Sequence, residues 1–424
     1  MSMTRVGIIA DDFTGATDIA SFLVQNGLST IQFNGVPQQH DALTAQAIVI
    51  SLKSRSCPPE QAVEQSLTAL CWLQAQGCDR FYFKYCSTFD STEQGNIGPV
   101  TDALLAALGE TQTAISPALP VNGRTVYQGH LFVGEQLLSD SGMRHHPVTP
   151  MTDSNLLRLM ARQSAGKAGL IAAPLLDRGA QAVREQLNEL KAQGVNYVVL
   201  DALNEQHLLT QGEALRDMRL VTGGSGLAIG LARQWAEAGS AAADAENAGR
   251  PQGERAVVIS GSCSQMTNRQ VSAYRQQAPS HEVEVARCLE NADAYAQALC
   301  DWVVAHSDQP LAPLLYATAD AQQLQKIQQQ YGAQRSSEAV EQLFAAVTRE
   351  LKARGWQRFI VAGGETSGVV AQSLGVTAFH IGPTISPGVP WVRDIHQPLS
   401  LALKSGNFGD EAFFRRAQTE FAHD

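Results

Sequence analysis

The chain has 424 residues, of which 44% are hydrophobic and 17% charged, and its formal net charge is -10. This length and composition predict two or three folded domains and argue against a disordered chain. The acidic balance argues against nucleic acid or an anionic membrane as a partner, because both are recognised by basic surfaces. Neither a signal peptide nor an apolar run of transmembrane length is visible, so we expect a cytoplasmic protein.

In the first half of the chain, short apolar runs alternate with polar loops and helical patterns. This alternation is typical of βαβ units with parallel sheets, in which ligands bind beyond the carboxyl ends of the strands. The predicted strands are residues 6–10, 47–52, 81–85, 113–116, 169–172 and 197–200, with a helix over residues 19–25 and a polar loop over residues 117–129.

Residues 238–254 (AGSAAADAENAGRPQGE) are rich in Ala, Gly and polar side chains and show no apolar period. This composition is typical of a linker. We therefore predict one domain over residues 1–238, a linker over residues 239–254 and a second domain over residues 255–424. The fold class we expect is α/β, with two domains that each hold a mainly parallel sheet flanked by helices.

The second half repeats the alternation of strands and helices. Residues 382–392 (GPTISPGVPWV) contain three prolines and predict either a rigid binding loop or a plain surface turn. The other predicted elements are strands over residues 256–259, 313–316, 359–362 and 401–404, a helix over residues 265–277, a helix that ends near residue 373 and a final helix at the C-terminal end.

The strongest local motif is the run Gly363, Gly364, Glu365 and Thr366 between a predicted strand and a predicted helix. Glycines let a phosphate approach the backbone, and a helix N-terminus offers free N–H groups. A tight turn without a ligand is the alternative for one such loop. No Walker A motif is present in the chain.

Two further loops have the same strand–loop–helix context in the same predicted domain. One is SGSCS, which contains Ser260 and Ser262, and the other is SGNFG, which contains Gly406. Three such loops favour a nucleotide-binding crevice over three unrelated turns. A fourth glycine-rich segment, residues 222–226 (TGGSG), is as consistent with a hinge beside the linker as with a phosphate site.

The first domain carries acidic side chains where its first strand ends: Asp11 and Asp12, with Asp18 a turn later. Carboxylates in this position can orient a hydroxyl, act as a general base or hold Mg²⁺. Capping of a helix by Asp12 is the structural alternative. Lys53 and Arg55 follow the next predicted strand, and either could bind a carboxylate.

Other polar residues fall at the third predicted strand of the first domain. Lys84 and Asp90 form a cluster there with Ser87 and Thr88. The adjacent pair His145 and His146 does not predict a metal site, because neighbours on an extended chain point apart; a histidine that contacts substrate is the alternative. The seven cysteines form no CxxC pair, so the sequence predicts neither a disulfide framework nor a zinc site.

Taken in order, several motifs resemble the four-carbon acid sugar kinase family over essentially the whole chain. They are ADDFTGATD, FKYCSTFDST followed by GN, PALPVNGRT, TGGSGLA, AGGETSG and LKSGNFG. Other branches of that family carry a basic residue before the GN pair, whereas this chain has Glu93 and Gln94 there. No role of that basic residue is carried over.

The resemblance implies an N-terminal acid-sugar domain, a C-terminal ATP domain and an active site in the crevice between them. It implies phosphorylation of the terminal hydroxyl of a 3-oxo-tetronate by ATP. We further expect that Mg²⁺ accompanies the ATP and that the protein could be a homodimer. The expected catalytic residues are Asp12 and, as an alternative, Asp90. The expected substrate-binding residues are Asp11, Asp18, Lys53, Arg55, Lys84 and Arg124, and the expected ATP-binding residues are Ser260, Ser262, Gly363, Gly364, Glu365, Thr366 and Gly406.

Three alternatives stay open at this point. Another four-carbon acid such as erythronate or threonate could be the substrate. A dinucleotide-dependent oxidoreductase would need a GxGxxG motif after the first strand, where this chain carries acids that would repel a pyrophosphate. A non-catalytic sugar-acid sensor would not need a second anion-binding domain.

Overall fold

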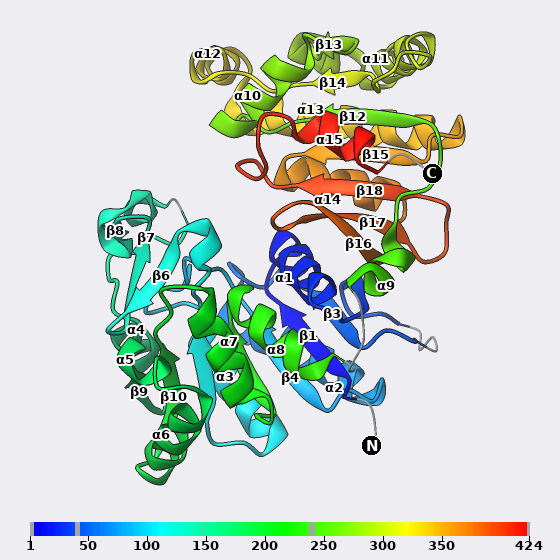
Figure 1. Ribbon diagram of the computed structural model, residues 1–424. Coiled ribbons are helices and arrows are strands. Elements are labelled where there is room, and N and C mark those ends of the chain that lie inside the picture. The colour runs from blue at the N-terminus through cyan, green and yellow to red at the C-terminus, as the bar shows by residue number, and fades with distance from the viewer. Residues whose placement is uncertain (1–3, 39–42, 147, 237–241, 422–424) are drawn as a thin grey trace. The chain divides into compact units, whose positions relative to one another are not determined.

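The computed structural model describes residues 4–38, 43–146, 148–236 and 242–421 (Figure 1). The chain forms two compact units, Met1–Ala245 and Glu246–Asp424. The division falls in helix α9 (Ala242–Glu246), inside the segment predicted as a linker. Residues 239–241 of that segment lie outside the described residues, and a 3-10 turn, η4 (Asn247–Gly249), follows α9.

The main sheet of the first unit is parallel, in the order β2-β3-β1-β4-β11-β5-β10-β9. All five residues of β1 are buried, as expected for a parallel sheet covered on both faces. The strands are β1 (Val6–Ala10), β2 (Thr30–Asn34), β3 (Ala47–Ser51), β4 (Arg80–Lys84), β5 (Thr113–Ser116), β9 (Lys167–Ile171), β10 (Val195–Leu200) and β11 (Leu220–Gly223).

Helices connect these strands, and the first of them begins earlier than predicted. Helix α1 starts at Phe13 rather than near residue 19, because the extended residue Asp12 caps it by accepting a hydrogen bond from the Gly15 amide. The other helices are α2 (Pro59–Ala75), α3 (Ile97–Leu108), α4 (Leu156–Gln163), α5 (Ala173–Leu176), α6 (Ala180–Ala192), α7 (Glu205–Leu215) and α8 (Gly226–Trp235).

The predicted polar loop over residues 117–129 instead contributes to a second sheet. This sheet is antiparallel, in the order β6-β7-β8, and stands apart from the main sheet of its unit (Figure 1). Its elements are η1 (Pro120–Asn122), β6 (Arg124–Tyr127), β7 (His130–Val133) and β8 (Gln136–Leu137), followed by η2 (Leu138–Asp140) and η3 (Gly142–His145).

The sheet of the second unit is mixed, in the order β13-β14-β12-β15-β18-β17-β16. Its first five strands are parallel, and β16 and β17 are antiparallel to their neighbours. The strands are β12 (Ala256–Ser260), β13 (Ser280–Glu282), β14 (Leu314–Tyr316), β15 (Arg358–Ala362), β16 (Ala378–Ser386), β17 (Val389–Asp394) and β18 (Ser400–Lys404).

Helices cover this second sheet, and buried aromatic side chains such as Trp391, Phe413 and Phe414 fill one side of its core. The α/β class with mainly parallel sheets is therefore confirmed. Among the described residues, no helix has the length and apolar character that a membrane crossing needs. The helices are α10 (Gln265–Tyr274), α11 (Val285–Ala305), α12 (Ala321–Tyr331), α13 (Ala333–Ala353), α14 (Gly364–Ser373) and α15 (Phe413–Thr419).

The proline-rich residues 382–392 were expected to form a binding loop or a surface turn, but most of them are strand and only residues 387–388 form a turn. They form much of the β16–β17 hairpin, and most of them are buried. The register shifts between Ile381 and Thr384 and again before Ser386. Such irregular pairing accommodates Pro383, which has no N–H to donate.

Candidate functional site

Four neighbouring strands of the first unit end at the same level. Ala10 of β1 pairs with Ser51 of β3 and with Lys84 of β4, and Lys84 pairs with Gly223 of β11. The residues that follow these strands therefore meet at one edge of the sheet. Asp11 and Asp12 follow β1 directly.

Arg55, four residues beyond β3, joins the two carboxylates of that edge. Its Nε donates to Asp11 Oδ2 at 3.0 Å, and its Nη2 lies 2.8 Å from both Asp11 Oδ1 and Asp12 Oδ1. Its Nη1 lies 3.9 Å from Asp90 Oδ2. No acceptor among the described residues forms a hydrogen bond with Nη1. The two N–H groups of Nη1 can therefore donate to another acceptor, such as a ligand.

The two adjacent carboxylates have opposite pKa shifts. Burial raises the pKa of Asp11, although Arg55 works against that shift. Burial also acts to raise the pKa of Asp12, but Arg55, Lys84 and hydrogen bonds from Thr14 and Gly15 outweigh it and hold that pKa below its usual value. Asp12 is therefore the carboxylate of this pair that stays ionised most readily.

Lys84 lies almost fully buried beneath these acids, with 2% of its surface exposed. Its Nζ donates to the Tyr85 carbonyl at 2.6 Å. A Cβ on Gly15 would lie only 2.3 Å from Asp12 Oδ1 and 3.0 Å from Lys84 Nζ, so the close approach of these groups requires glycine. Lys84 supplies positive charge to Asp11, Asp12 and Asp18.

Asp90 comes from the loop after β4, where the backbone is strained. Phe89 and Asp90 have φ values of 66° and 45°, in the left-handed region that non-glycine residues rarely occupy. The Thr88 hydroxyl donates to Asp90 Oδ1 at 2.7 Å and fixes the carboxylate that faces Arg55. Strain of this kind often accompanies functional sites.

Asp18 lies one turn along α1 and accepts a hydrogen bond from Ser225 at the start of α8. Burial raises the pKa of Asp18, and Lys84 and Arg124 oppose the shift. Asp18 Oδ1 and Arg124 Nε are both buried without a hydrogen-bond partner among the described residues. Neither polar atom is thus satisfied by the described part of the chain.

Lys53 is the predicted residue that the structure does not bring into this cluster. Its side chain is exposed, and no ion pair or hydrogen bond from it is found in the described parts of the chain. Sequence reasoning missed Ser225 as the partner of Asp18. It also missed the structural role of Asn96, whose Nδ2 donates to the carbonyls of Ser54, Arg55 and Cys57 and so holds the Arg55 loop.

In the second unit, β12, β15 and β18 also end at one level. Ser260 pairs with Ala362, and Ala362 pairs with Lys404. The three predicted loops follow these strand ends and pack closely. A Cβ on Gly261 would lie 2.1 Å from Thr366 Oγ1, and one on Gly406 would lie 2.7 Å from Ser262 Oγ.

The two predicted serines of the first loop lie in different surroundings. Ser260 is fully buried, and its hydroxyl lies 2.6 Å from the Thr318 hydroxyl. Ser262 lines a cavity of about 340 Å³, together with the whole GGET run. Gly363 has a φ of 123°, a conformation that favours glycine, and a Cβ on Gly364 would meet no atom within 4 Å.

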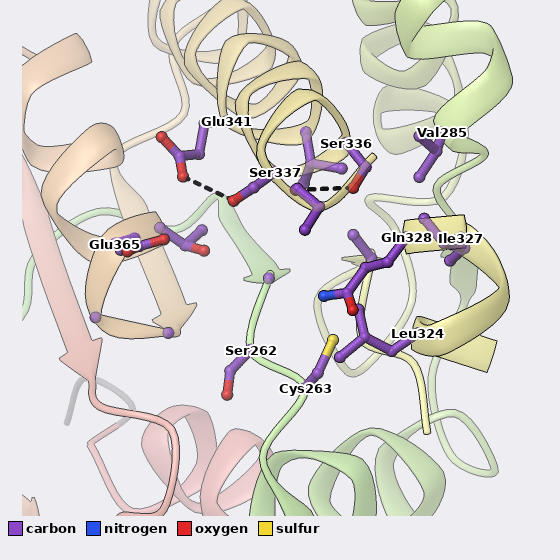
Figure 2. A pocket seen from close by; sticks show the side chains of 17 residues that line it. Ser262, Cys263, Val285, Leu324, Ile327, Gln328, Ser336, Ser337, Glu341 and Glu365 are labelled. Carbon is purple, nitrogen blue, oxygen red and sulfur yellow. Dashed lines mark hydrogen bonds between the residues drawn. The ribbon is translucent and has the colours of Figure 1, made fainter. Parts of the chain in front are cut away.

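Figure 2 shows this cavity between the loops and the helices α12 and α13. Leu324, Ile327 and Val285 give it apolar walls, and Glu341 approaches Glu365 on its polar side. Burial raises the pKa of Glu341, and the nearby Glu365 adds to the shift. No part of the sequence pattern had indicated that α12 and α13 form these walls.

Family comparisons divide the chain in the same way. The sugar-binding N-terminal domain family matches residues 6–231, and the nucleotide-binding C-terminal domain family matches residues 257–414. The chain is 69% identical to a 3-oxo-tetronate kinase of Pectobacterium atrosepticum, over 99% of this chain and 100% of the relative. It is 63% identical to that of Salmonella typhimurium, with 99% and 100% covered.

Solved structures agree with these sequence matches. A crystal structure of a Salmonella typhimurium LT2 protein shares 63% identity and a TM-score of 0.95, over 99% of this chain and 100% of that one. The Haemophilus influenzae protein HI1011 shares 53% identity and a TM-score of 0.87, over 98% and 100%. With both domain families matched in order and full-length relatives this similar, the chain belongs to the 3-oxo-tetronate kinase family of four-carbon acid sugar kinases.

Proposed function

We propose that this protein transfers the γ-phosphoryl group of ATP to the terminal hydroxyl of 3-oxo-tetronate. A bond forms between O4 of the acid and the γ-phosphorus, the bond from that phosphorus to ADP breaks, and a carboxylate accepts the hydroxyl proton. Its closely similar relatives are 3-oxo-tetronate kinases. One observation carries the proposal: the same chain holds two matching sites. The first unit has a carboxylate, Asp12, that is fixed in place and has a lowered pKa, and the second unit has glycine-rich loops at the starts of helices.

The nucleotide binds in the cavity of the second unit in this proposal. Its apolar walls, including Leu324 and Ile327, suit an adenine ring, and a volume of about 340 Å³ falls in the range of small-ligand pockets. The backbone N–H groups at the start of α14 suit the phosphates, because Gly363 and Gly364 leave that approach open. Glu365, beside Glu341, is an acceptor suited to ribose hydroxyls rather than to phosphate.

The other predicted ATP-binding residues take different parts in this scheme. Ser262 and Thr366 face the cavity and can donate to phosphate oxygens. Ser260, whose hydroxyl is buried against Thr318, positions its loop. Gly406 lets its loop pack against Ser262, where a side chain would clash.

The acid sugar binds at the strand ends of the first unit. Asp12 accepts the proton from O4, since its lowered pKa keeps it ionised and Arg55 and Gly15 fix its orientation. Asp90 is the second candidate for this role. The Nη1 edge of Arg55, which lies 3.9 Å from Asp90, binds the substrate carboxylate, for which a planar guanidinium is well suited. Lys53, which lies outside this cluster, is the alternative cation for that contact.

The remaining charged groups of the first unit bind and balance charge. Asp11 holds Arg55 in place through two hydrogen bonds. Lys84 offsets the negative charge of the acids and of the incoming phosphoryl group. The unpartnered atoms of Asp18 and Arg124 bind the hydroxyl and keto oxygens of the substrate.

Mg²⁺ enters this scheme with the phosphates of ATP, where it neutralises charge. The described residues contain no group of three or more His, Cys, Asp or Glu side chains placed to hold a metal ion. The carboxylates of Asp11 and Asp12 are already paired with Arg55, so they are not free to bind a metal ion. We therefore propose that the nucleotide carries the ion and that no separate protein cage holds it.

The reaction requires the two bound substrates to meet, so we propose that it takes place in a crevice between the domains that excludes water when closed. We further propose a cytoplasmic enzyme with domains at residues 1–238 and 255–424, joined by a linker at residues 239–254, that can act as a homodimer. Its partner is a small acid sugar, not nucleic acid or a membrane.

The test is ADP release from ATP by the purified full-length protein. We expect ADP to form only when 3-oxo-tetronate and Mg²⁺ are both present. Binding of ADP without any turnover on this acid, or on erythronate or threonate, would contradict the proposed reaction and favour a sensor.

A further inference from the structure

Lys404, the last residue of β18, lies where the three loops of the second unit meet. Its own carbonyl accepts a hydrogen bond from the Gly363 amide at 2.8 Å, which ties it to the GGET loop. Its Nζ donates to the carbonyls of Ser405 and Gly406 at 2.9 Å and 2.8 Å, and to the Thr267 hydroxyl at 3.1 Å. One side chain thus connects β18, its following loop and α10.

The Gly406 carbonyl is the centre of this arrangement. Besides Lys404, it accepts from the Ser264 hydroxyl at 2.6 Å and from the Thr267 hydroxyl at 2.7 Å. Ser264 also caps α10, the helix that follows the serine loop. Three donors, Ser264, Thr267 and Lys404, therefore hold the Gly406 carbonyl and keep this loop beside the serine loop.

The three acceptors around Nζ match the three protons of an ammonium group. A neutral amine has only two N–H groups, so its lone pair would face one of these oxygens. Lys404 is nevertheless fully buried, and burial alone lowers its pKa to about 7. The hydrogen bonds favour the ammonium form, whereas burial away from water favours the neutral amine. A small change in the charge near Nζ can therefore decide whether Lys404 is protonated.

Among the described residues, no carboxylate forms an ion pair with this cation. Its hydrogen-bond acceptors are uncharged. The centre of the Phe413 ring, on α15, lies 6.0 Å from Nζ. Asp410 pairs with Arg416 at 2.9 Å. The other charged groups at this end of the adjoining elements are exposed: Arg269 on α10, Glu365 on α14, and Glu411 and Arg415 at α15.

We propose that Lys404 is a positioning residue that holds the three loops in their nucleotide-binding arrangement and becomes protonated when a nucleoside polyphosphate binds. This inference rests on the proposed function. The anionic phosphates supply the charge that the protein does not, and so favour the ammonium form. Binding therefore takes up a proton above neutral pH and weakens as the pH rises.

The experiment is calorimetric titration of the full-length protein with ADP at pH 8 to 9, where the phosphates of ADP are almost completely ionised. Each titration is run in two buffers of different ionisation enthalpy, which gives the number of protons bound. We expect the wild type to take up as much as one proton per ADP, and its affinity to fall by up to about tenfold per pH unit. Adenosine, which lacks phosphates, should bind with no such uptake.

Lys404→Met keeps the side chain as far as Cε and removes the charged nitrogen. We expect weaker ADP binding, no proton uptake and an affinity independent of pH in this range. Arg358→Met is the matched control. Arg358 is also a buried cation, and its Nε and Nη2 have no described hydrogen-bond partner. It lies where β15 begins, at the opposite end of the strands from Lys404. It should keep the proton uptake.

The outcomes separate this inference from the proposed function. Failure of the wild type to bind ADP would contradict the nucleotide site itself. Binding of ADP by the wild type without proton uptake would overturn the role of Lys404 alone, and this measurement does not depend on whether the variant folds. Undiminished proton uptake in a folded Lys404→Met protein would overturn it equally.

Discussion

Nη2 of Arg55 lies 2.8 Å from Oδ1 of Asp12, the same oxygen that accepts the Gly15 amide at 2.9 Å. The other oxygen, Oδ2, accepts the Thr14 hydroxyl at 2.9 Å. The carboxylate proposed as the base is therefore held by two donors of the helix start and by one cation. An arrangement of this kind fixes a base without leaving it free to rotate.

Asp12→Asn should lower kcat by on the order of 10²-fold or more, because an amide cannot accept the proton in the transition state. Folding should persist, since asparagine caps helices as well as aspartate does, as Asn155 and Asn204 do in this chain. Steady-state kinetics with ADP detection measures the effect. Asp217→Asn, at an exposed carboxylate, is the control. Near-normal turnover of Asp12→Asn would remove Asp12 from the mechanism.

Arg55→Lys should raise KM for the acid sugar and lower kcat, with KM for ATP unchanged. Lysine keeps the charge but cannot contact Asp11, Asp12 and a substrate carboxylate together. Initial rates over a matrix of both substrate concentrations separate the two constants. An unchanged KM for the acid would assign the carboxylate contact to another cation, and Lys53→Ala would then be the next variant.

Gly364→Val should abolish nucleotide binding while the first unit stays folded. A Cβ at this position would meet no protein atom within 4 Å, and Gly364 lines the cavity, so the added side chain should occupy the space where the phosphates are proposed to bind. Gly368→Val is the matched control on the same helix, where a Cβ is equally unhindered but lies away from the cavity. Calorimetry with ADP measures both, and intact binding by Gly364→Val would reduce the loop to a structural turn.

Lys404 should also make the stability of the fold depend on pH. Its folded pKa of about 7 lies below the ordinary value of 10.5, so the unfolded chain binds the proton more tightly. The free energy of unfolding should therefore rise as the pH increases from about 7 towards 10.5. Comparing denaturant midpoints of the wild type and Lys404→Met at pH 7.5 and 9.5 isolates this contribution. An equal pH dependence in both proteins would contradict the depressed pKa.

The sequence was sufficient where a local pattern determines the structure. Buried runs such as VGIIA predicted strands, and the polar residues after them, including Asp12 and Arg55, do meet at one sheet edge. The start of α1 was missed because the polar run DDFTGATD resembles a loop, although Asp12 is an effective helix cap.

Features that depend on tertiary packing could not be predicted in this way. The walls of the cavity come from Leu324 and Ile327 on a helix whose sequence has no binding signature. In the sequence, Lys404 resembles an ordinary solvated lysine at the end of a strand. In the structure it is buried, because Phe413 and α10 pack around it. The hairpin over β16 and β17 was hidden by its prolines, which are usually rare inside sheets.

The central claim is that the first unit binds an acid sugar by its carboxylate and presents its terminal hydroxyl for phosphorylation. The most direct measurement is phosphorus NMR of the product, together with ADP release rates, for 3-oxo-tetronate, erythronate, threonate, a five-carbon aldonate and the neutral sugar erythrose. We predict the fastest turnover on 3-oxo-tetronate and a phosphate on O4 alone. Faster turnover on erythrose than on any acid, or a product phosphorylated at O2, would contradict the account.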